Sequence, residues 1–315
     1  MARYLITGIA GFIGSTLAHA LVERGDEVRG IDNLCTGSLD NLAGIRDLID
    51  FQQMDLQDIA GMKSACEGVD YVLHQAALAS VPRSVKDPLT SHESNINGTL
   101  NLLLAARDAR VRRIVYAASS SAYGDQPTQP KQEDMPPLPL SPYAVQKLAC
   151  EYYIQAFYRS YGLEGICLRY FNIFGPRQAA DSPYSGVIAK FTTSMMAGET
   201  PTIFGDGLTS RDFNYVDNAV SANLLACQAP SAVATGRVFN VGTGKSHTLN
   251  EVYAAIAGLL GFTGKPVYGS HRAGDIRHSL ADISRATKEL GYQPKAHFHD
   301  GLQKTVAWYL VEKEK

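Results

Sequence analysis

The sequence predicts an α/β fold in which a doubly wound parallel sheet shares the chain with a smaller, interleaved C-terminal α/β domain. Through the first half, short β-branched runs alternate with segments whose apolar residues recur at helical spacing. Such alternation is typical of a parallel sheet with helices on both faces. After about residue 172 the rhythm breaks and Gly, Pro and Ser become frequent, which indicates the loops of a second, smaller domain.

The individual elements follow from this pattern. The predicted strands are 3–8, 27–32, 50–55, 71–76 and 113–118. The predicted helices are 12–25, 97–110, one that begins at Pro142, 249–262 and 301–313. With 315 residues, 45% of them hydrophobic, the chain can bury a large core, in one big domain or in two interleaved ones.

Charge and cysteine usage exclude several classes of function. The net charge of −2 gives no indication of a nucleic-acid or anionic-membrane surface. The apolar run after Met1 is short and has no basic region before it, so we expect no signal peptide and no membrane helix. The five cysteines are scattered without a CxxC pair. This spacing argues against a disulfide framework or a metal site and favours the reducing cytoplasm.

The stretch TGIAGFIG places Gly8, Gly11 and Gly14 between a predicted strand and a predicted helix. Without side chains, these positions allow a tight turn, close approach of the backbone to a pyrophosphate and close helix packing. The helix N-terminus then faces the phosphate. A glycine-rich turn without function would show the same letters, but the strand–turn–helix context favours a dinucleotide-binding, Rossmann-like domain.

Asp32 ends the second predicted strand, 18 residues beyond the third glycine. A carboxylate there accepts hydrogen bonds from a ribose 2′-hydroxyl and repels a 2′-phosphate, so NAD is favoured over NADP as the cofactor. Arg29 and Arg3 could attract a 2′-phosphate, and they leave NADP open.

A second glycine motif, GTGKS at 242–246, resembles the end of a nucleotide-triphosphate loop. That loop needs a glycine five residues before Gly244, and position 239 is Phe. We therefore expect GTGKS to lead into the helix that follows it.

A tyrosine and a lysine stand four residues apart in SPYAVQK. Ser141 can cap a helix and Pro142 suits its first turn, which places Tyr143 and Lys147 on one face. A free tyrosine titrates near a pKa of ~10, but a nearby ammonium and an oxidised nicotinamide ring lower that value. An exposed pair without function would have the same spacing. The dinucleotide loop and the hydroxyl cluster in AASSSAYGD favour a proton-transfer site.

Many motifs together make the sequence similar to the extended short-chain dehydrogenase/reductase family and, within it, to the UDP-sugar 4-epimerases. The resemblance runs nearly end to end, through TGIAGFIG, DNLCTG, HQAAL, NINGTLNLL, SSSAYGD, SPYAVQK, LRYFNIFGPRQ, GDGLTSRDFNYVDN, FNVGTG and RAGDIRHSLADISRA. It implies that Tyr143 is the base, that Lys147 orients the ribose and lowers the tyrosine pKa, and that Ser119 bonds the reacting hydroxyl. Ser119 is preferred over Ser120 because it lies four residues before Tyr123.

The resemblance also implies two sets of binding residues. The NAD set is Gly8, Gly11, Phe12, Ile13, Gly14, Asp32, Asn33, Asp55, Leu56, Gln75, Ala76, Ala77, Asn95, Tyr143, Lys147 and Tyr170. The UDP-sugar set is Ala79, Ser80, Ser119, Ser121, Asn172, Gln178, Val187, Arg211, Arg272, Asp275 and Ser279. An arginine suits a diphosphate because its planar fork makes paired hydrogen bonds, although a surface ion pair is the alternative for each one.

The type of reaction depends on the residues after the catalytic hydroxyl. Related sugar dehydratases carry Asp-Glu there, and sugar-acid decarboxylases carry a nearby Glu. Here these positions are Ser120 and Ser121, which are poor acids and bases. The resemblance therefore implies C4 epimerisation, in which a hydride leaves C4, the 4-keto sugar turns, and the hydride returns to the other face.

Ser279 bears on the choice of sugar, because some family members have a bulky Tyr there that narrows the hexose pocket. A serine leaves room for a 2-acetamido group, and Gln178 and the segment 74–84 also resemble the branch that prefers N-acetylated sugars. Ala79 departs from the Gly of that branch. We expect UDP-GlcNAc and UDP-GalNAc as substrates, with UDP-Glc/UDP-Gal and UDP-glucuronate as alternatives. If Ser279 instead faces solvent or caps the next helix, this argument fails.

The resemblance further implies two interleaved domains and a homodimer. The NAD-binding domain would comprise 1–171 and about 214–241, and the UDP-sugar-binding domain about 172–213 and 242–315. Helices at about 95–109 and 143–160 would pair between two subunits as a four-helix bundle, although the apolar face of LNLLLAA could equally pack on its own sheet. Some relatives bind a dinucleotide without catalysis, as sensors or scaffolds, but these typically lack the Tyr or the Lys.

Overall fold

A parallel sheet of seven strands organises the larger part of the computed structural model, which describes residues 1–180, 186–271 and 276–313. The strand order is β11-β6-β5-β4-β1-β2-β3, with every neighbouring pair parallel. The strands are β1 (Arg3–Thr7), β2 (Glu27–Asp32), β3 (Asp50–Gln53), β4 (Tyr71–His74), β5 (Arg113–Ser119), β6 (Glu164–Tyr170) and β11 (Thr235–Val241). The order reverses between β1 and β4, where the carboxyl ends of an open parallel sheet leave a crevice for ligands.

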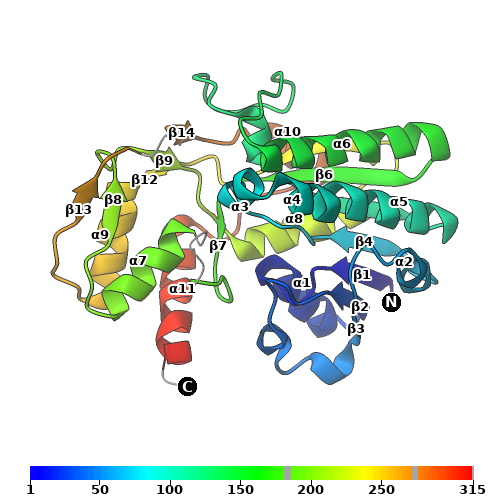
Figure 1. Cartoon of the computed structure of the whole chain (residues 1–315), viewed down its shortest axis with the longest axis horizontal. Helices are drawn as coiled ribbons and strands as arrows, with labels where there is room; N and C mark the ends of the chain where they lie inside the picture. Colours follow the sequence, from blue (N-terminus) through cyan, green and yellow to red (C-terminus); the bar gives the residue numbers. More distant parts are fainter. Residues whose placement is uncertain (181–185, 272–275, 314–315) are drawn as a thin grey trace.

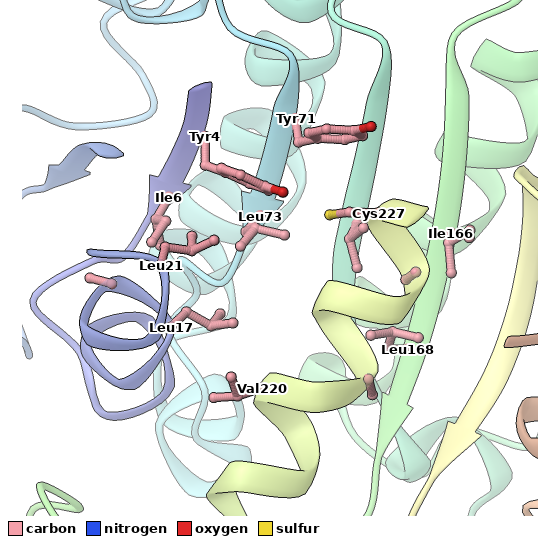
Figure 2. Close-up of a cluster of buried hydrophobic side chains, with 14 of the residues drawn as sticks. Tyr4, Ile6, Leu17, Leu21, Tyr71, Leu73, Ile166, Leu168, Val220 and Cys227 are labelled. Carbon is pink, nitrogen blue, oxygen red and sulfur yellow. The ribbon is translucent and has the colours of Figure 1, made fainter. Parts of the chain in front are cut away.

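Helices cover both faces of this sheet (Figure 1). One face carries α1 (Phe12–Glu23), α8 (Val216–Gln228) and α10 (Ser284–Leu290), and the other carries α2 (Ile59–Cys66), α5 (Gly98–Asp108) and α6 (Pro142–Tyr161). Figure 2 shows Leu17 and Leu21 of α1 and Val220 of α8 among the apolar side chains of the first face. Each such buried side chain contributes roughly 1.5–3 kcal/mol, so these layers hold the crevice in place.

A smaller body of short elements lies beside the sheet, on the left of Figure 1. Its helices are α7 (Val187–Met196), α9 (Leu249–Leu260) and α11 (Phe298–Lys313), and its strands are β7 (Ile173–Phe174), β8 (Thr202–Phe204), β9 (Ser210–Arg211), β10 (Asn214–Tyr215), β12 (His247–Thr248), β13 (Val267–Gly269) and β14 (His278–Ser279). The strands pair as β10-β7, β13-β8 and β12-β9-β14. Phe174, Phe213 and Phe298 pack edge-on or tilted in the centre of this body.

Short helical turns complete the fold. They are η1 (Leu39–Leu42), η2 (Arg46–Leu48), α3 (Val81–Lys86), α4 (Pro88–His92), η3 (Glu93–Asn97) and η4 (Ser120–Tyr123). In the described part of the chain, no helix combines the length and apolar character that crossing a bilayer requires.

The predicted α/β fold class is confirmed, and the five predicted strands coincide with β1 to β5. The predicted strands 50–55 and 71–76 are too long, because the chain leaves the sheet after Gln53 and His74 and lines a cavity. The prediction omits β6 and β11. Both are buried along most of their length but contain an arginine, which interrupts the apolar run that marks a strand.

The helix ends follow local signals. Ser141 accepts a hydrogen bond from the Ala144 N–H at 3.2 Å, so the predicted cap of α6 is confirmed. GTGKS leads into α9 as predicted, and Thr248 and Glu251 form a capping box at its start. The predicted helix 301–313 begins three residues earlier, at Phe298. The domain boundaries at 172, 214 and 242 stay a prediction.

Candidate active site

The glycine loop after β1 has the backbone geometry that close approach of a dinucleotide needs. Gly8 has φ +69°, and a Cβ on it would lie 2.8 Å from the Ala76 backbone. A Cβ on Gly14 would lie 2.1 Å from the Gly8 carbonyl oxygen, so the third glycine allows α1 to pack on the turn. Gly11 is the N-cap of α1 and carries no side chain to occupy the N–H groups of its first turn. These groups are therefore available to an anion.

Asp32 is the last residue of β2 and lies in the wall of a narrow cavity of about 90 Å³. We call this the cofactor cavity; its other walls are Gly8, Gly11, Ile31, Asn33, Cys35, Thr36, Met54, Asp55, Leu56, Gln75, Ala76, Ala77, Leu78 and Ser94. The Asp32 carboxylate accepts the N–H of Ala10 at 2.9 Å and of Leu34 at 2.8 Å. Burial raises the pKa of Asp32, and the two N–H groups oppose this rise. The two bonds fix the carboxylate in the cavity wall at the end of β2.

The two arginines that left NADP open bind elsewhere. Arg29 pairs with Asp50 at 2.6 Å and donates to the carbonyl of Ala65 at 2.9 Å. Arg3 pairs with Glu27 at 2.6 Å. Both guanidinium groups are therefore committed to partners other than a 2′-phosphate, which agrees with NAD.

A second cavity, of about 450 Å³, adjoins the first and shares Gln75 and Ala77 with it. We call it the catalytic cavity. It brings together most of the predicted catalytic and sugar-binding residues: Ala79, Ser119, Ser120, Ser121, Tyr143, Lys147, Asn172, Gln178, Arg211 and Ser279. Three further residues of the predicted NAD set also line it: Phe12, Ile13 and Tyr170. These residues come from α1, the end of β5, the start of α6 and the short strands of the smaller body, so the cavity lies between the two parts of the chain.

Tyr143 stands in the first turn of α6 and lines the catalytic cavity with Ser119, whose hydroxyl lowers the pKa of Tyr143. The Ser119 hydroxyl is itself fixed, because it accepts the Ser121 N–H at 3.2 Å and the Ser121 hydroxyl at 2.8 Å. Burial raises the pKa of Tyr143, and the Ser119 hydroxyl opposes this rise. The expected lowering of this pKa by Lys147 is not what the structure shows, because desolvation of the phenol dominates.

Lys147 lies one turn after Tyr143 and is buried. Its ammonium donates to the Ala117 carbonyl at 2.8 Å and lies 4.8 Å from the centre of the Tyr116 ring. Burial lowers the pKa of Lys147 to about 8, while Cys150 and Glu151 act in the opposite direction. The lysine is thus held between strand β5 and helix α6, with its charge poorly solvated.

Ser279 is buried and lies in the wall of the catalytic cavity. It belongs to β14 and pairs in register with Arg211 of β9, and its carbonyl accepts the Asp212 N–H at 2.7 Å. It therefore neither faces solvent nor caps α10, whose N-cap is Ile283.

A third cavity, of about 540 Å³, continues from the second and shares Asn172, Ile173, Gln178 and Arg211 with it. We call it the outer cavity. Val187, from the predicted substrate set, lines it together with Lys190, Phe191, Phe204 and Phe213. A largely apolar recess next to an arginine can hold a flat base with its phosphates.

Three predicted site residues do not line any of these cavities. Gly14 supports the turn behind the cofactor cavity. Ser80 caps α3, accepting the Arg83 N–H at 3.1 Å. Asn95 is buried and accepts the Leu78 N–H at 2.8 Å, so it positions the loop after β4 from behind. Arg272 and Asp275 lie outside the described residues.

The structure adds residues that sequence reasoning missed. Lys131 is buried in the wall of the catalytic cavity, and its backbone bonds to Leu280 and Asp282. Phe204 and Phe213 line the outer cavity. All three come from loops or from a strand of three residues, so no periodicity could identify them. His278, which the sequence indicates as a pocket-lining or structural histidine, lines the catalytic cavity, and its ring forms a hydrogen bond with Ser210 at 2.9 Å.

His74 is a structural residue of β4. Its ring bonds the hydroxyls of Thr7 at 2.6 Å and Thr99 at 2.9 Å. Burial lowers the pKa of His74 to about 3, and the charge of Lys147 acts in the same direction. The ring therefore stays neutral, and it links β4 to Thr7 of β1 and to Thr99 of α5.

Comparison with known proteins gives this site its family. The chain matches the model of the NAD dependent epimerase/dehydratase family over residues 4–242. It is 39% identical over 312 residues to a UDP-glucose 4-epimerase of Mycolicibacterium smegmatis, with 98% of each chain covered. Its fold matches a UDP-N-acetylglucosamine 4-epimerase from Methanobrevibacter ruminantium M1 in complex with UDP-N-acetylmuramic acid (TM-score 0.94, 40% identity, 99% of each chain). It matches equally a UDP-glucose 4-epimerase with UDP-glucose from Thermotoga maritima (TM-score 0.94, 37% identity, 99% of each chain).

These matches cover the cofactor cavity and the Tyr–Lys pair together with the smaller body, so they concern the whole chain. The chain therefore belongs to the NAD dependent epimerase/dehydratase family, within the extended short-chain dehydrogenase/reductases, and is an NAD-dependent epimerase.

Proposed function

We propose that this epimerase inverts C4 of a UDP-hexose and that UDP-GlcNAc and UDP-GalNAc are its preferred pair. The choice of sugar rests on the position of Ser279, whose small, buried side chain lies in the wall of the catalytic cavity. A small residue there leaves volume for an acetamido group that a tyrosine would fill. The similarity to a UDP-N-acetylglucosamine 4-epimerase supports the same choice.

Tyr143 is the base and Ser119 its partner at the reacting hydroxyl. Both side chains line the catalytic cavity, so a C4 hydroxyl placed between them can pass its proton to the phenolate while Ser119 holds the oxygen. Tyr143 then returns the proton after the 4-keto sugar has turned. The fixed position of the Ser119 hydroxyl, held by Ser121, keeps the oxygen in one place on both passes.

Lys147 supplies the positive charge that the phenolate needs, from one turn further along α6. NAD bound in the cofactor cavity would supply a hydride acceptor that gives the hydride back. Asp32 would bind its ribose hydroxyls, and the N-terminus of α1 would face its phosphates. Arg211, between the catalytic and outer cavities, is placed to bind the substrate diphosphate.

A second candidate is a UDP-glucose 4-epimerase. The similarity to the enzymes of Mycolicibacterium smegmatis and Thermotoga maritima favours it. The chemistry would be the same, since only the group at C2 differs between the two substrate pairs. The two candidates therefore differ in the sugar pocket alone.

A side-by-side measurement of kcat/KM for UDP-GlcNAc, UDP-Glc, UDP-glucuronate and their C4 epimers tests the proposal. We expect the highest value for the acetamido pair. A value for UDP-Glc or UDP-glucuronate that exceeds it would refute the choice of sugar. Failure to interconvert any of these sugars would instead favour a dinucleotide-binding sensor or scaffold.

We also propose that two copies of the chain pair through α5 and α6, in the cytoplasm. Val145 and Tyr152 lie on one face of α6 and are 49% and 53% exposed. Leu89 and Val85, on the neighbouring α4 and α3, are 68% and 64% exposed. Large apolar side chains exposed together on neighbouring helices are typical of an interface.

Sedimentation at micromolar concentration tests this assembly. We expect a dimer for the unaltered chain and dissociation for Val145→Glu. The matched control is Val267→Glu, since Val267 is 54% exposed on β13 in the smaller body. A monomeric unaltered chain would contradict the proposal, and so would equal dissociation by both variants.

A further inference from the structure

A buried ion pair lies directly behind the catalytic cavity. Glu151 of α6 accepts two parallel hydrogen bonds from the Arg169 guanidinium of β6, at 2.9 and 2.7 Å. The two side chains are only 1% and 5% exposed. Neither residue has a role in the reaction described above. A pair of this geometry fixes the distance between the two elements that it joins.

Arg169 extends the pair toward the other catalytic segment. Its guanidinium lies 4.7 Å from the centre of the Tyr123 ring, at the end of the turn η4 that follows Ser119. The Tyr123 hydroxyl donates to Asn240 at 2.7 Å, and Asn240 donates to the Lys131 carbonyl at 2.8 Å. The ion pair therefore joins α6, which carries Tyr143 and Lys147, to the turn that carries Ser119 and to the catalytic cavity wall.

Glu151 also lies one helical turn after Lys147, on the same face of α6. The other titratable groups near Lys147 are neutral at physiological pH. Burial lowers the pKa of His74, on β4, and raises the pKa values of Tyr116, on β5, and of Cys150 and Tyr143, on α6. The carboxylate of Glu151 is thus the negative charge that favours the ammonium form of Lys147.

We propose that Glu151 is a positioning residue for Lys147: its carboxylate, fixed by Arg169, keeps the lysine ammonium charged beside Tyr143. Burial raises the pKa of Glu151, and the hydrogen bonds and charge of Arg169 oppose this rise. The guanidinium always stays charged and matches a carboxylate in shape, so it favours the ionised form of Glu151 in this buried place. The proposal rests on the function proposed above, in which the charged lysine favours the tyrosine phenolate.

The pH profile of kcat tests this role. Activity that needs a charged Lys147 is lost as pH rises through the pKa of that lysine. Glu151→Gln keeps the shape of the side chain and removes its charge, so the pKa of Lys147 should fall. We expect the high-pH limb to move to lower pH by about one unit, with roughly tenfold lower kcat near that limb and little change in KM.

The chain offers a matched control in Arg113 and Glu164. This pair joins β5 to β6, at 2.9 and 2.6 Å with Arg113 fully buried, but at the amino ends of the strands, away from the site. Glu164→Gln should lower the melting temperature, as Glu151→Gln should, while leaving the pH profile unchanged. An equal shift of the profile in both variants would overturn the proposal.

A double variant separates the effect of losing the Glu151 carboxylate from the effect of leaving the Arg169 guanidinium unpaired. In Glu151→Gln/Arg169→Gln no unpaired charge is buried, so folding is preserved if the single variant fails to fold. The profile should stay shifted, because Glu151 is still absent. A return to the unaltered profile would mean that the unpaired arginine caused the shift, and the proposal would be wrong.

An NMR titration distinguishes this proposal from the proposed function. With ¹³C-labelled lysine, and the Lys147 signal assigned by its loss in Lys147→Arg, the pKa of Lys147 is measured without any substrate. A lower pKa in Glu151→Gln supports the proposal even if the chain interconverts no UDP-hexose. An unchanged pKa overturns it even if the epimerase activity is confirmed.

Discussion

The cofactor cavity and the sugar end of the catalytic cavity are built in opposite ways. The former lies at the carboxyl ends of consecutive parallel strands, and its described walls all fall between Gly8 and Ser94. The latter is assembled from Asn172, Arg211 and Ser279, which lie far apart in sequence on loops and strands of two residues. With the roles proposed above, the sheet part supplies the chemistry and the smaller body selects the sugar, so we expect changes in the smaller body to alter the sugar without disturbing the chemistry.

The largest effect should come from the sheet part. Tyr143→Phe removes one hydroxyl from a half-buried ring in the cavity wall, so fold and cofactor should be retained. We expect kcat to fall by about 10²–10⁴-fold, the usual worth of a positioned acid–base group, for every UDP-sugar alike. Near-normal turnover of any UDP-sugar would remove Tyr143 from the mechanism.

A smaller loss should follow from the serine that contacts this tyrosine. Ser119→Ala removes the hydroxyl that lowers the pKa of Tyr143 and would hold the reacting oxygen, and we expect a loss of roughly 10²-fold in kcat. Ser120→Ala, the neighbouring change in the same wall, serves as the control and should cost less. The reverse order would show that Ser120 is the catalytic hydroxyl.

The effect of one side chain on cofactor preference should be smaller still. Asp32→Asn keeps an acceptor for the Ala10 N–H but removes the charge that repels a 2′-phosphate. We expect the ratio of Kd values, NADP over NAD, to fall by about tenfold or more, as for the loss of a charged hydrogen bond. Fluorescence titration with both dinucleotides measures it, with Asp55→Asn in the same wall as the control. Tighter binding of NADP by the unaltered chain would contradict the role of Asp32.

The smallest effect should be the selective one. Ser279→Tyr places a phenol ring in the wall of the catalytic cavity, where an acetamido group would then clash. Overpacking costs about 1–3 kcal/mol, so UDP-GlcNAc and UDP-GalNAc should lose at least about tenfold in kcat/KM while UDP-Glc and UDP-Gal are spared. Equal losses would indicate general damage, and no loss would place the residue away from the sugar.

The same contrast explains how much the sequence could predict. The turn at Gly8, the end of β2 at Asp32 and the cap at Ser141 each depend on residues within one strand–turn–helix unit. Local signals were sufficient there. The raised pKa of Tyr143 depends on burial beneath segments far along the chain, which spacing within α6 cannot reveal.

In the smaller body, local signals in the sequence were not sufficient. Its strands are two or three residues long, too short for an alternating pattern, so β9 and β14 could not be predicted. The pairing of Ser279 with Arg211 and the burial of Lys131 follow from this tertiary arrangement. Strand β6 was missed for a related reason, because Arg169 in its buried run is stabilised by partners far along the chain, Glu151 and the Tyr123 ring.

The most direct test of the central claim, that a hydride leaves C4 and returns to C4 inside the catalytic cavity, is the fate of deuterium at that carbon. UDP-GlcNAc labelled with deuterium at C4 would be epimerised in ordinary water and the product examined by NMR. The proposed cycle predicts that UDP-GalNAc keeps the deuterium at C4, because the hydride never exchanges with solvent while NAD holds it. Loss of the label to water would contradict the account, since it would mean that C4 is inverted by proton exchange rather than by transient oxidation.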